Sequence, residues 1–211
     1  MQTIALVDYG MGNLHSAAKA VEKVAPDVRV LISQKPEEIL AADRVIFPGV
    51  GAMRDCMHEI HAMGLDEVVR EAARSRPLLG ICVGMQAMLQ HSDENNGVDC
   101  LGLFAGNVEH FASNMTDAAG KLKIPHMGWN QVHQRNNHPL WANIEQDERF
   151  YFVHSYFVKP QDEAIVAADC EYGVKFCAAL TRDNVFAVQF HPEKSHKAGL
   201  QLLANFANWK V

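Results

Sequence analysis

The sequence predicts an α/β protein in which an open, twisted and mostly parallel sheet lies between two layers of helices, with an antiparallel extension in the second half. Two observations support this prediction. Short apolar runs alternate with amphipathic helical patterns up to residue 91, an order typical of a parallel sheet with helices on both faces. Beyond residue 91 the chain predicts one strand after another, and only its last stretch is helical.

In the first half, apolar runs and helical spacing of apolar side chains alternate along the chain. Strands are predicted at residues 3–7, 28–32, 44–47 and 77–81. Helices are predicted at residues 14–24, 36–40, 53–60, 65–72 and 85–90. Pro36 suits the first turn of its helix, and Gly64 separates the third helix from the fourth.

The second half begins with a polar loop at residues 92–99 and ends with a helix at 197–209. Between them, apolar segments predict strands at residues 107–111, 124–133, 150–158, 164–168, 174–181 and 185–190. Asp183 and Asn184 favour a hairpin turn before the last of these strands. Because no linker or repeat interrupts the chain, we expect a single domain over residues 1–211.

Composition narrows the class of protein. The 211 residues carry a net charge of −6 with acids and bases interspersed, so no basic footprint for nucleic acid is present. No apolar run is long enough for a membrane span, and the N-terminus reads as a first strand instead of a signal peptide. The five cysteines are odd in number and lack CxxC spacing, which suits a reducing cytoplasm. We expect a cytoplasmic protein with no metal, cofactor, nucleic-acid or membrane partner.

Cys82 stands between a predicted strand and a predicted helix, with Gly80 and Gly84 two residues away on either side. This is the layout of a nucleophile elbow with sulfur in place of the usual hydroxyl, where the tight turn leaves no room for neighbouring side chains. A helix N-terminus just beyond the cysteine favours the thiolate over the thiol. The alternative is an inert core cysteine, since free cysteines are among the most buried residues.

His191, Pro192 and Glu193 directly follow the strand predicted at residues 185–190. Sites in open α/β sheets form at the carboxyl ends of strands, so we expect His191 to meet Cys82 there. A histidine can activate the thiol and protonate a leaving group, and Glu193 is placed to orient its imidazole. Taken alone, His191 also fits a core or surface histidine.

Acyl transfer further requires donors to an oxyanion. The backbone N–H of Val83, just after the cysteine, is one candidate. A second donor is expected from residues 48–51, Pro-Gly-Val-Gly, which also follow a strand. The alternative is a simple turn, which Pro-Gly sequences commonly form.

The motifs around Cys82, Pro48 and His191 together resemble those of the class I (triad) glutamine amidotransferases. Residues 8–13 (DYGMGN), 125–130 (PHMGWN) and 154–156 (HSY) narrow the resemblance to the glutaminase subunits of imidazole glycerol phosphate synthase. The resemblance runs from residue 4 to about residue 205. It implies a flavodoxin-like, three-layer fold.

The resemblance implies hydrolysis of L-glutamine to glutamate and ammonia through a thioester on Cys82. Ammonia would pass to a separate (β/α)8-barrel cyclase subunit, as a heterodimer, for synthesis of imidazole glycerol phosphate and an aminoimidazole carboxamide ribotide in histidine biosynthesis. Two alternatives stay open. One is a class I glutaminase that serves another ammonia acceptor, and the other is a non-catalytic regulatory domain of the same fold.

The resemblance also implies roles for individual residues. Cys82, His191 and Glu193 would form the triad, and the backbone N–H groups of Val50 and Val83 the oxyanion hole. Glutamine would be bound by Gly49, Gly51, Gln86, Ser155 and Tyr156. The cyclase would be contacted by Asn13, Met127, Trp129, Tyr151 and Lys194. His196 stands where the family leads us to expect a small polar residue near the substrate carboxylate, and Cys56, Cys100, Cys170 and Cys177 are taken as structural.

Overall fold

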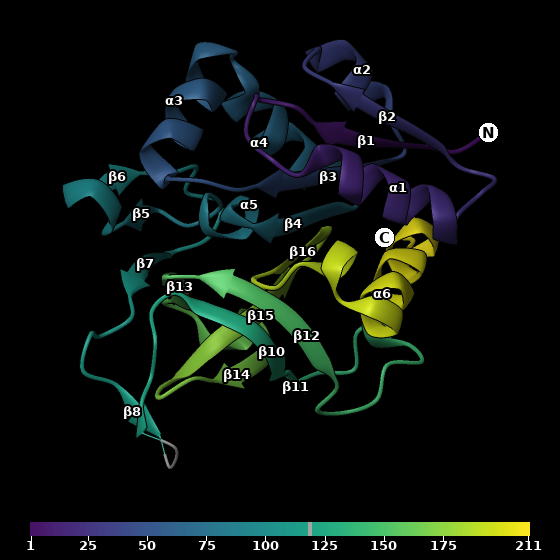
Figure 1. Ribbon diagram of the computed structural model, residues 1–211. Helices are drawn as coiled ribbons and strands as arrows, with labels where there is room; N and C mark the ends of the chain where they lie inside the picture. The colour runs from purple at the N-terminus through teal and green to yellow at the C-terminus, as the bar shows by residue number, and fades with distance from the viewer. Residues whose placement is uncertain (118–119) are drawn as a thin grey trace.

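The parallel half of the main sheet is built from the first four predicted strands and the last one (Figure 1). In the computed structural model, which describes residues 1–117 and 120–211, the strand order is β2 (Arg29–Ser33), β1 (Thr3–Val7), β3 (Arg44–Gly49), β4 (Leu78–Cys82) and β16 (Val185–Val188). All neighbours in this series are parallel. Every residue of β3, β4 and β16 is buried, and apart from Arg44 at the start of β3 the three strands have no charged or polar side chain except the Cys82 thiol.

Helices cover both faces of this parallel half, which confirms the predicted three-layer class. On one face α1 (Leu14–Val24) packs against α6 (His196–Asn208). On the other face α4 (Leu65–Ser75) contacts both α2 (Pro36–Ala41) and α3 (Met53–Ala62). Within the described residues, no helix is both long and apolar enough to cross a membrane.

The antiparallel extension starts where β15 (Lys175–Arg182) pairs with β16 through the predicted turn, in which Asp183 has a φ of 51°. The sheet continues through β13 (Tyr156–Pro160) and β7 (Gly106–His110) to β5 (His91–Ser92) and β6 (Val98–Asp99). A separate pair, β10 (His126–Gln131) and β12 (Arg149–His154), lies beside it. The remaining elements are α5 (Val83–Gln86), β8 (Thr116–Asp117), β9 (Gly120–Lys121), β11 (His133–Gln134), β14 (Val166–Glu171), η1 (Glu94–Asn96), η2 (Pro139–Trp141), η3 (Glu163–Ile165) and η4 (Pro192–Lys194).

The strands predicted at 124–133 and 150–158 are wrong as single elements, because each is divided between two sheets. The chain leaves β12, which pairs with β10, and enters β13, which pairs with β7 and β15, with Ser155 between them. It likewise passes from β10 to β11, a partner of β14, at Val132. The apolar pattern runs through both transitions, so the pattern shows no break.

The helix predicted at 85–90 is present but wrong in extent, since α5 begins at Val83 and ends at Gln86. The physical reason is competition for its carbonyls. The backbone N–H groups of Leu101, Phe104 and Gly102 donate to the carbonyls of Ala87, Met88 and Leu89 respectively. These carbonyls would otherwise accept from the next helical turn.

The loop predicted at 92–99 contains β6 and η1 and is held against α3. The Glu94 carboxylate accepts a hydrogen bond of 2.9 Å from the backbone N–H of Met53, the first residue of α3. This contact satisfies one of the unpaired donors at the helix N-terminus. Other predicted boundaries differ from the observed ones by a few residues.

Candidate active site

Cys82 is the last residue of β4, and α5 begins directly after it. Its backbone has a φ of 54° and a ψ of −113°, a conformation that non-glycine residues rarely adopt. Holding such a residue costs of the order of 1–3 kcal/mol, which the surrounding packing must offset. The sharp turn predicted from the two flanking glycines is therefore present, and it is strained.

The glycines around the turn are required by close contacts between elements. A Cβ on Gly84 would overlap the backbone carbonyl oxygen of Phe47 in β3. A Cβ on Gly49 would overlap the Tyr9 hydroxyl and lie 2.9 Å from the backbone nitrogen of Gly84. Since Gly49 pairs with Cys82 across β3 and β4, these contacts bring the end of β3 against the start of α5.

His191 and Glu193 follow β16, which lies next to β4 in the sheet. The imidazole Nδ1 lies 2.9 Å from Oε1 of Glu193, and both side chains are buried. A carboxylate can only accept, so Nδ1 carries a proton and Nε2 is left for chemistry. Within residues 1–117 and 120–211, neither Nε2 nor the second Glu193 oxygen has a hydrogen-bond partner.

The environment of His191 favours its charged form. Burial by itself lowers the pKa of the imidazole, but the Cys82 sulfur and the Glu193 carboxylate outweigh it and raise the pKa to about 10. At neutral pH the histidine is therefore an imidazolium, which can give a proton from Nε2 to a leaving group.

Ser195, to which sequence analysis gave no role, joins the loop that carries His191 to strand β12 by hydrogen bonds. Its hydroxyl donates to the His191 carbonyl at 2.6 Å and accepts from the Tyr151 N–H at 2.9 Å. The backbone N–H of His191 in turn donates to the Tyr151 carbonyl at 2.9 Å. The base is thus held from both the parallel and the antiparallel half.

A cavity of about 310 Å³ opens beside the nucleophile, and both Cys82 and His191 line it. The predicted residues Val50, Gly51, Val83, Gln86, Ser155 and Tyr156 line the same cavity. Gly49 does not; it lies beneath, in the contact with Tyr9 and Gly84. Four further residues line it to which sequence reasoning gave no role there, namely Glu94, Pro125, Val153 and His154. Of these, Pro125 and His154 belong to motifs that carry the family resemblance, whereas Glu94 and Val153 had no signal in the sequence.

The two predicted oxyanion donors, Val50 and Val83, line the same cavity as the cysteine. Val83 is the first residue of α5, where a backbone N–H has no acceptor within the helix. Val50 follows β3, and its carbonyl accepts from the Cys56 thiol at 3.5 Å. Gly51 has a φ of 100°, so the turn after Val50 depends on glycine.

Two glutamine side chains connect the cavity wall to the nucleophile. Nε2 of Gln86 donates to the Tyr156 carbonyl and to Oε1 of Gln189, both at 2.9 Å. Nε2 of Gln189 lies 3.7 Å from the Cys82 sulfur. Because both hydrogens of the Gln86 amide are used inside the protein, its oxygen is the atom left to bind a ligand.

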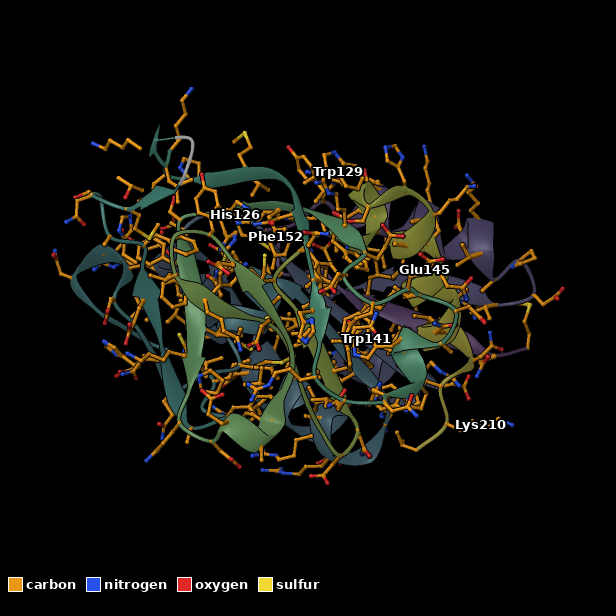
Figure 2. All side chains as sticks on the ribbon, turned by 90° about the horizontal axis from the view of Figure 1, so that it is seen from below. His126, Trp129, Trp141, Glu145, Phe152 and Lys210 are labelled. Atoms are coloured by element: carbon orange, nitrogen blue, oxygen red, sulfur yellow. The ribbon has the colours of Figure 1, made fainter. Side chains whose placement is uncertain are left out.

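The five residues predicted to contact a partner lie on neighbouring elements around the triad. Trp129 and Tyr151 are paired across β10 and β12, and their rings are 6.0 Å apart. Met127 and Trp129 are 62% and 42% exposed, unusual for large apolar side chains, and Figure 2 shows Trp129 at the margin of the molecule. Asn13 lies near His191 and Glu193 on the side of α1, and Lys194 is exposed at the end of η4.

His196 lies away from the cavity. It is the first residue of α6, has a φ of 45° and stacks on Trp129 with 4.9 Å between ring centroids. It is not among the residues that line the cavity beside Cys82. His196 therefore has no direct contact with the cavity through which it could disturb the binding of the substrate carboxylate.

The other cysteines differ from Cys82 in their surroundings. Burial raises the pKa of the Cys56 thiol to about 11 and those of Cys100 and Cys170 to about 12. Cys177 is shifted in the same direction for the same reason. These four thiols stay neutral, as expected of structural cysteines. The described residues contain no group of three or more His, Cys, Asp or Glu side chains placed to hold a metal ion.

A second cavity, of about 440 Å³, lies far along the antiparallel sheet between β13 and β15. Its charged residues are already paired, since Asp169 lies 2.8 Å from Nζ of Lys175 and 3.6 Å from Nε of Arg135. It contains neither residue of the Cys82–His191 pair. The cavity beside Cys82 is therefore the candidate active site.

Comparison with known proteins agrees with this geometry. The family model described as glutamine amidotransferase class-I matches residues 5–209. The chain is 58% identical over 212 residues to imidazole glycerol phosphate synthase subunit HisH of Acinetobacter baylyi, covering 100% of both chains. It is 58% identical over 209 residues to the subunit HisH 1 of Pseudomonas aeruginosa, covering 99% of this chain and 98% of the relative.

Among solved structures, the crystal structure of a glutamine amidotransferase superposes with a TM-score of 0.72, covering 98% of this chain and 99% of the other. The two sequences are only 16% identical, so this likeness supports the fold alone.

Proposed function

The chain belongs to the class I glutamine amidotransferases, and on that premise we propose that it is the glutaminase subunit of imidazole glycerol phosphate synthase. It hydrolyses L-glutamine to glutamate and ammonia. One observation carries the proposal: Cys82, on a strained strand-to-helix turn, shares its cavity with His191, whose other ring nitrogen is held by Glu193.

The reaction proceeds in two halves at Cys82. The thiolate attacks the side-chain amide carbon of glutamine, and the N–H groups of Val50 and Val83 stabilise the oxyanion. His191 passes the proton on Nε2 to the amide nitrogen, so the C–N bond breaks, ammonia leaves and a thioester remains. His191 then takes a proton from water, the water oxygen attacks the thioester, and glutamate departs with the thiolate restored.

The lining of the cavity supports an amino-acid substrate. The Glu94 carboxylate is placed to attract the α-ammonium group of glutamine, and Gln86 presents its amide oxygen. Ser155 lies at the junction between β12 and β13, next to Tyr156. We assign these two residues to the α-carboxylate end of glutamine.

The exposed apolar side chains support a protein partner. Met127 and Trp129 are exposed on the same strand, and Trp129 contacts Tyr151 and His196. Interfaces are enriched in aromatic residues and methionine. We assign this face to a (β/α)8-barrel cyclase in a heterodimer, which receives the ammonia without its release to solvent. The five free cysteines are consistent with a cytoplasmic enzyme.

The proposal is tested with Cys82→Ala in the presence of the purified cyclase and its nucleotide substrate. Glutamine-dependent synthesis of imidazole glycerol phosphate should be lost, whereas ammonia-dependent synthesis should continue, because the cyclase does not use the thiol. Glutamate release that persists in Cys82→Ala would show that the nucleophile is wrong. Glutaminase activity without any product from the cyclase would point instead to another ammonia acceptor.

A further inference from the structure

Behind the glutamine cavity, a line of hydrogen bonds runs from strand β10 to the nucleophile. It starts at Asn130, whose Nδ2 lies 3.3 Å from Nε2 of His126. Nδ1 of His126 lies 2.9 Å from Nε2 of His154, and Nδ1 of His154 lies 2.7 Å from the Tyr156 carbonyl. Gln86 donates to the same carbonyl from its other side.

The chemistry of the groups fixes which atom donates in each hydrogen bond from Asn130 to the Tyr156 carbonyl. A carbonyl only accepts, so Nδ1 of His154 must be protonated, and Nε2 of a neutral His154 accepts from Nδ1 of His126. Nε2 of His126 then accepts from Asn130. Burial lowers the pKa of His126 to about 4 and that of His154 to about 3, so both rings are neutral at pH 7 and each has one tautomer.

Packing fixes the two rings in place. His126 and His154 are cross-strand neighbours in the β10–β12 pair. The His126 ring stacks on Tyr172, with 4.0 Å between the ring centroids, and on Phe152, with 4.9 Å between the ring centroids. Figure 2 shows His126 beside Phe152. The Phe111 ring meets both imidazoles edge-on. The line therefore joins the β10–β12 pair to the main sheet at a rigid point.

The far end of the line reaches the sulfur. The Tyr156 carbonyl accepts from both His154 and Gln86, Gln86 donates to Gln189, and Gln189 points its amide nitrogen at Cys82. His154 lines the cavity, but both of its nitrogens are engaged within the protein. It therefore has no ring nitrogen to offer a ligand and acts through its neighbours.

We propose that His126 and His154 are positioning residues for glutamine turnover. By fixing the Tyr156 carbonyl, they set the orientation of the Gln86 amide and the contact between Gln189 and Cys82. The inference rests on the proposed glutaminase function, and it assigns to the two histidines a role in substrate binding and nucleophile placement, outside the triad.

The test compares His154→Phe with His154→Asn in the full chain assayed with the cyclase. Phenylalanine keeps the ring packing and loses both hydrogen bonds of His154. Because only the bond to the Tyr156 carbonyl acts on Gln86, kcat/KM for glutamine should fall about tenfold, mainly through a higher KM, as expected for the loss of one hydrogen bond. Asparagine places an amide N–H where Nδ1 stood, so it should recover most of the loss. If the role of His154 were purely structural, the loss of kcat/KM would parallel the loss of thermal stability, and His154→Asn would show no such recovery.

His138→Phe is the matched control. His138 is also a neutral, partly buried histidine, but it packs on Phe186 and Trp209 and accepts from the Leu140 N–H, away from the cavity. We expect it to alter the melting temperature and leave KM unchanged. An equal rise in KM in His138→Phe, or equal KM values for His154→Phe and His154→Asn, would overturn the proposal.

Two further measurements keep the test decisive. If His154→Phe fails to fold, Asn130→Ala, at the half-buried start of the line, should still raise KM about twofold, and an unchanged KM would count against the line. The rate of Cys82 alkylation by iodoacetamide needs no glutamine turnover. It should differ between His154→Phe and the wild type and return towards the wild-type rate in His154→Asn; identical rates in all three would refute the link to the sulfur. Wild-type protein without glutaminase activity would refute the proposed function instead.

Discussion

The histidine of the parallel half and the two histidines of the antiparallel half are all buried, yet their surroundings act on them in opposite directions. Next to Cys82 and Glu193, the pKa of His191 is raised to about 10 despite its burial. His126 and His154 contact aromatic rings and neutral donors, and burial lowers their pKa values to about 4 and 3. Burial alone makes a neutral, structural imidazole, whereas interactions with the Cys82 sulfur and the Glu193 carboxylate turn His191 into a proton donor.

The same comparison extends to the two halves of the sheet. The parallel strands β3, β4 and β16 end together, so they bring Val50, Cys82 and His191 to one place. The antiparallel half contributes Ser155 and Tyr156 to the wall of the cavity. It also carries the exposed apolar side chains of β10. The proposed triad and the exposed face proposed for the partner are thus on different parts of one structure.

The largest expected effect comes from the parallel half. In Glu193→Gln the amide no longer favours the imidazolium and can hold the wrong tautomer of His191, so glutamine turnover should fall by about 10⁴-fold. Glutamate release in the presence of the cyclase measures the effect, and ammonia-dependent synthesis is the internal control. Turnover within tenfold of the wild type would show that Glu193 does not orient the base.

The next effect tests how rigid the elbow is. Gly84→Ala should lower the free energy of unfolding by about 3 kcal/mol, because the new methyl group meets the backbone carbonyl of Phe47. Gly80→Ala is the matched comparison: its methyl would lie 2.9 Å from the flexible end of Met88 and 3.0 Å from the Ala187 Cβ, so we expect a smaller loss. Urea unfolding of both variants decides the order, and a reversed order would contradict the contacts described.

The antiparallel half is tested at its exposed face. Trp129→Ala should weaken binding to the cyclase by about 2 kcal/mol, or roughly 30-fold in Kd, if this tryptophan is an anchor of the interface. Val174→Ala removes another exposed apolar side chain, on the loop between β14 and β15, and should leave Kd unchanged. Calorimetric titration compares the two, and equal Kd values would place the interface elsewhere.

The last effect, which is the smallest when counted per pH unit, contrasts the histidines directly. The raised pKa of His191 means that the folded state holds a proton that the unfolded state releases above pH 6.5, so its stabilising contribution is lost as the pH rises from 6.5 towards 10. The lowered pKa of His126 acts in the opposite direction. The unfolded state takes up a proton below pH 6.5 that the folded state does not bind, so the free energy of unfolding falls as the pH falls from 6.5 towards 4.

Unfolding at a series of pH values measures both slopes. Relative to the wild type, His191→Gln should remove up to about 1.4 kcal/mol per pH unit of the decline in the alkaline range. His126→Phe should remove a similar slope in the acidic range. If both variants changed the free energy of unfolding in the same pH range, the contrast between the two environments would be disproved.

Prediction from the sequence succeeded best in the parallel half. The central strands there are buried on both faces and alternate with amphipathic helices, so each element has its own local pattern. It failed at Ser155 and Val132, where the chain changes sheets within an unbroken apolar pattern. It also failed after Gln86, where the segment from Leu101 to Phe104 takes the carbonyls that would continue the helix.

The sequence by itself determined the order of strands and helices in the parallel half, the glycine-flanked turn at Cys82 and the pairing of His191 with Glu193, because each depends on neighbours a few residues apart. Only the tertiary structure decided that Glu94, His154 and Gln189 join the site. Their side chains reach it through hydrogen bonds and cavity walls formed by residues far apart in the chain. Such contacts leave no periodic or local signal, since they depend on which sheet edges and loops are brought together on folding.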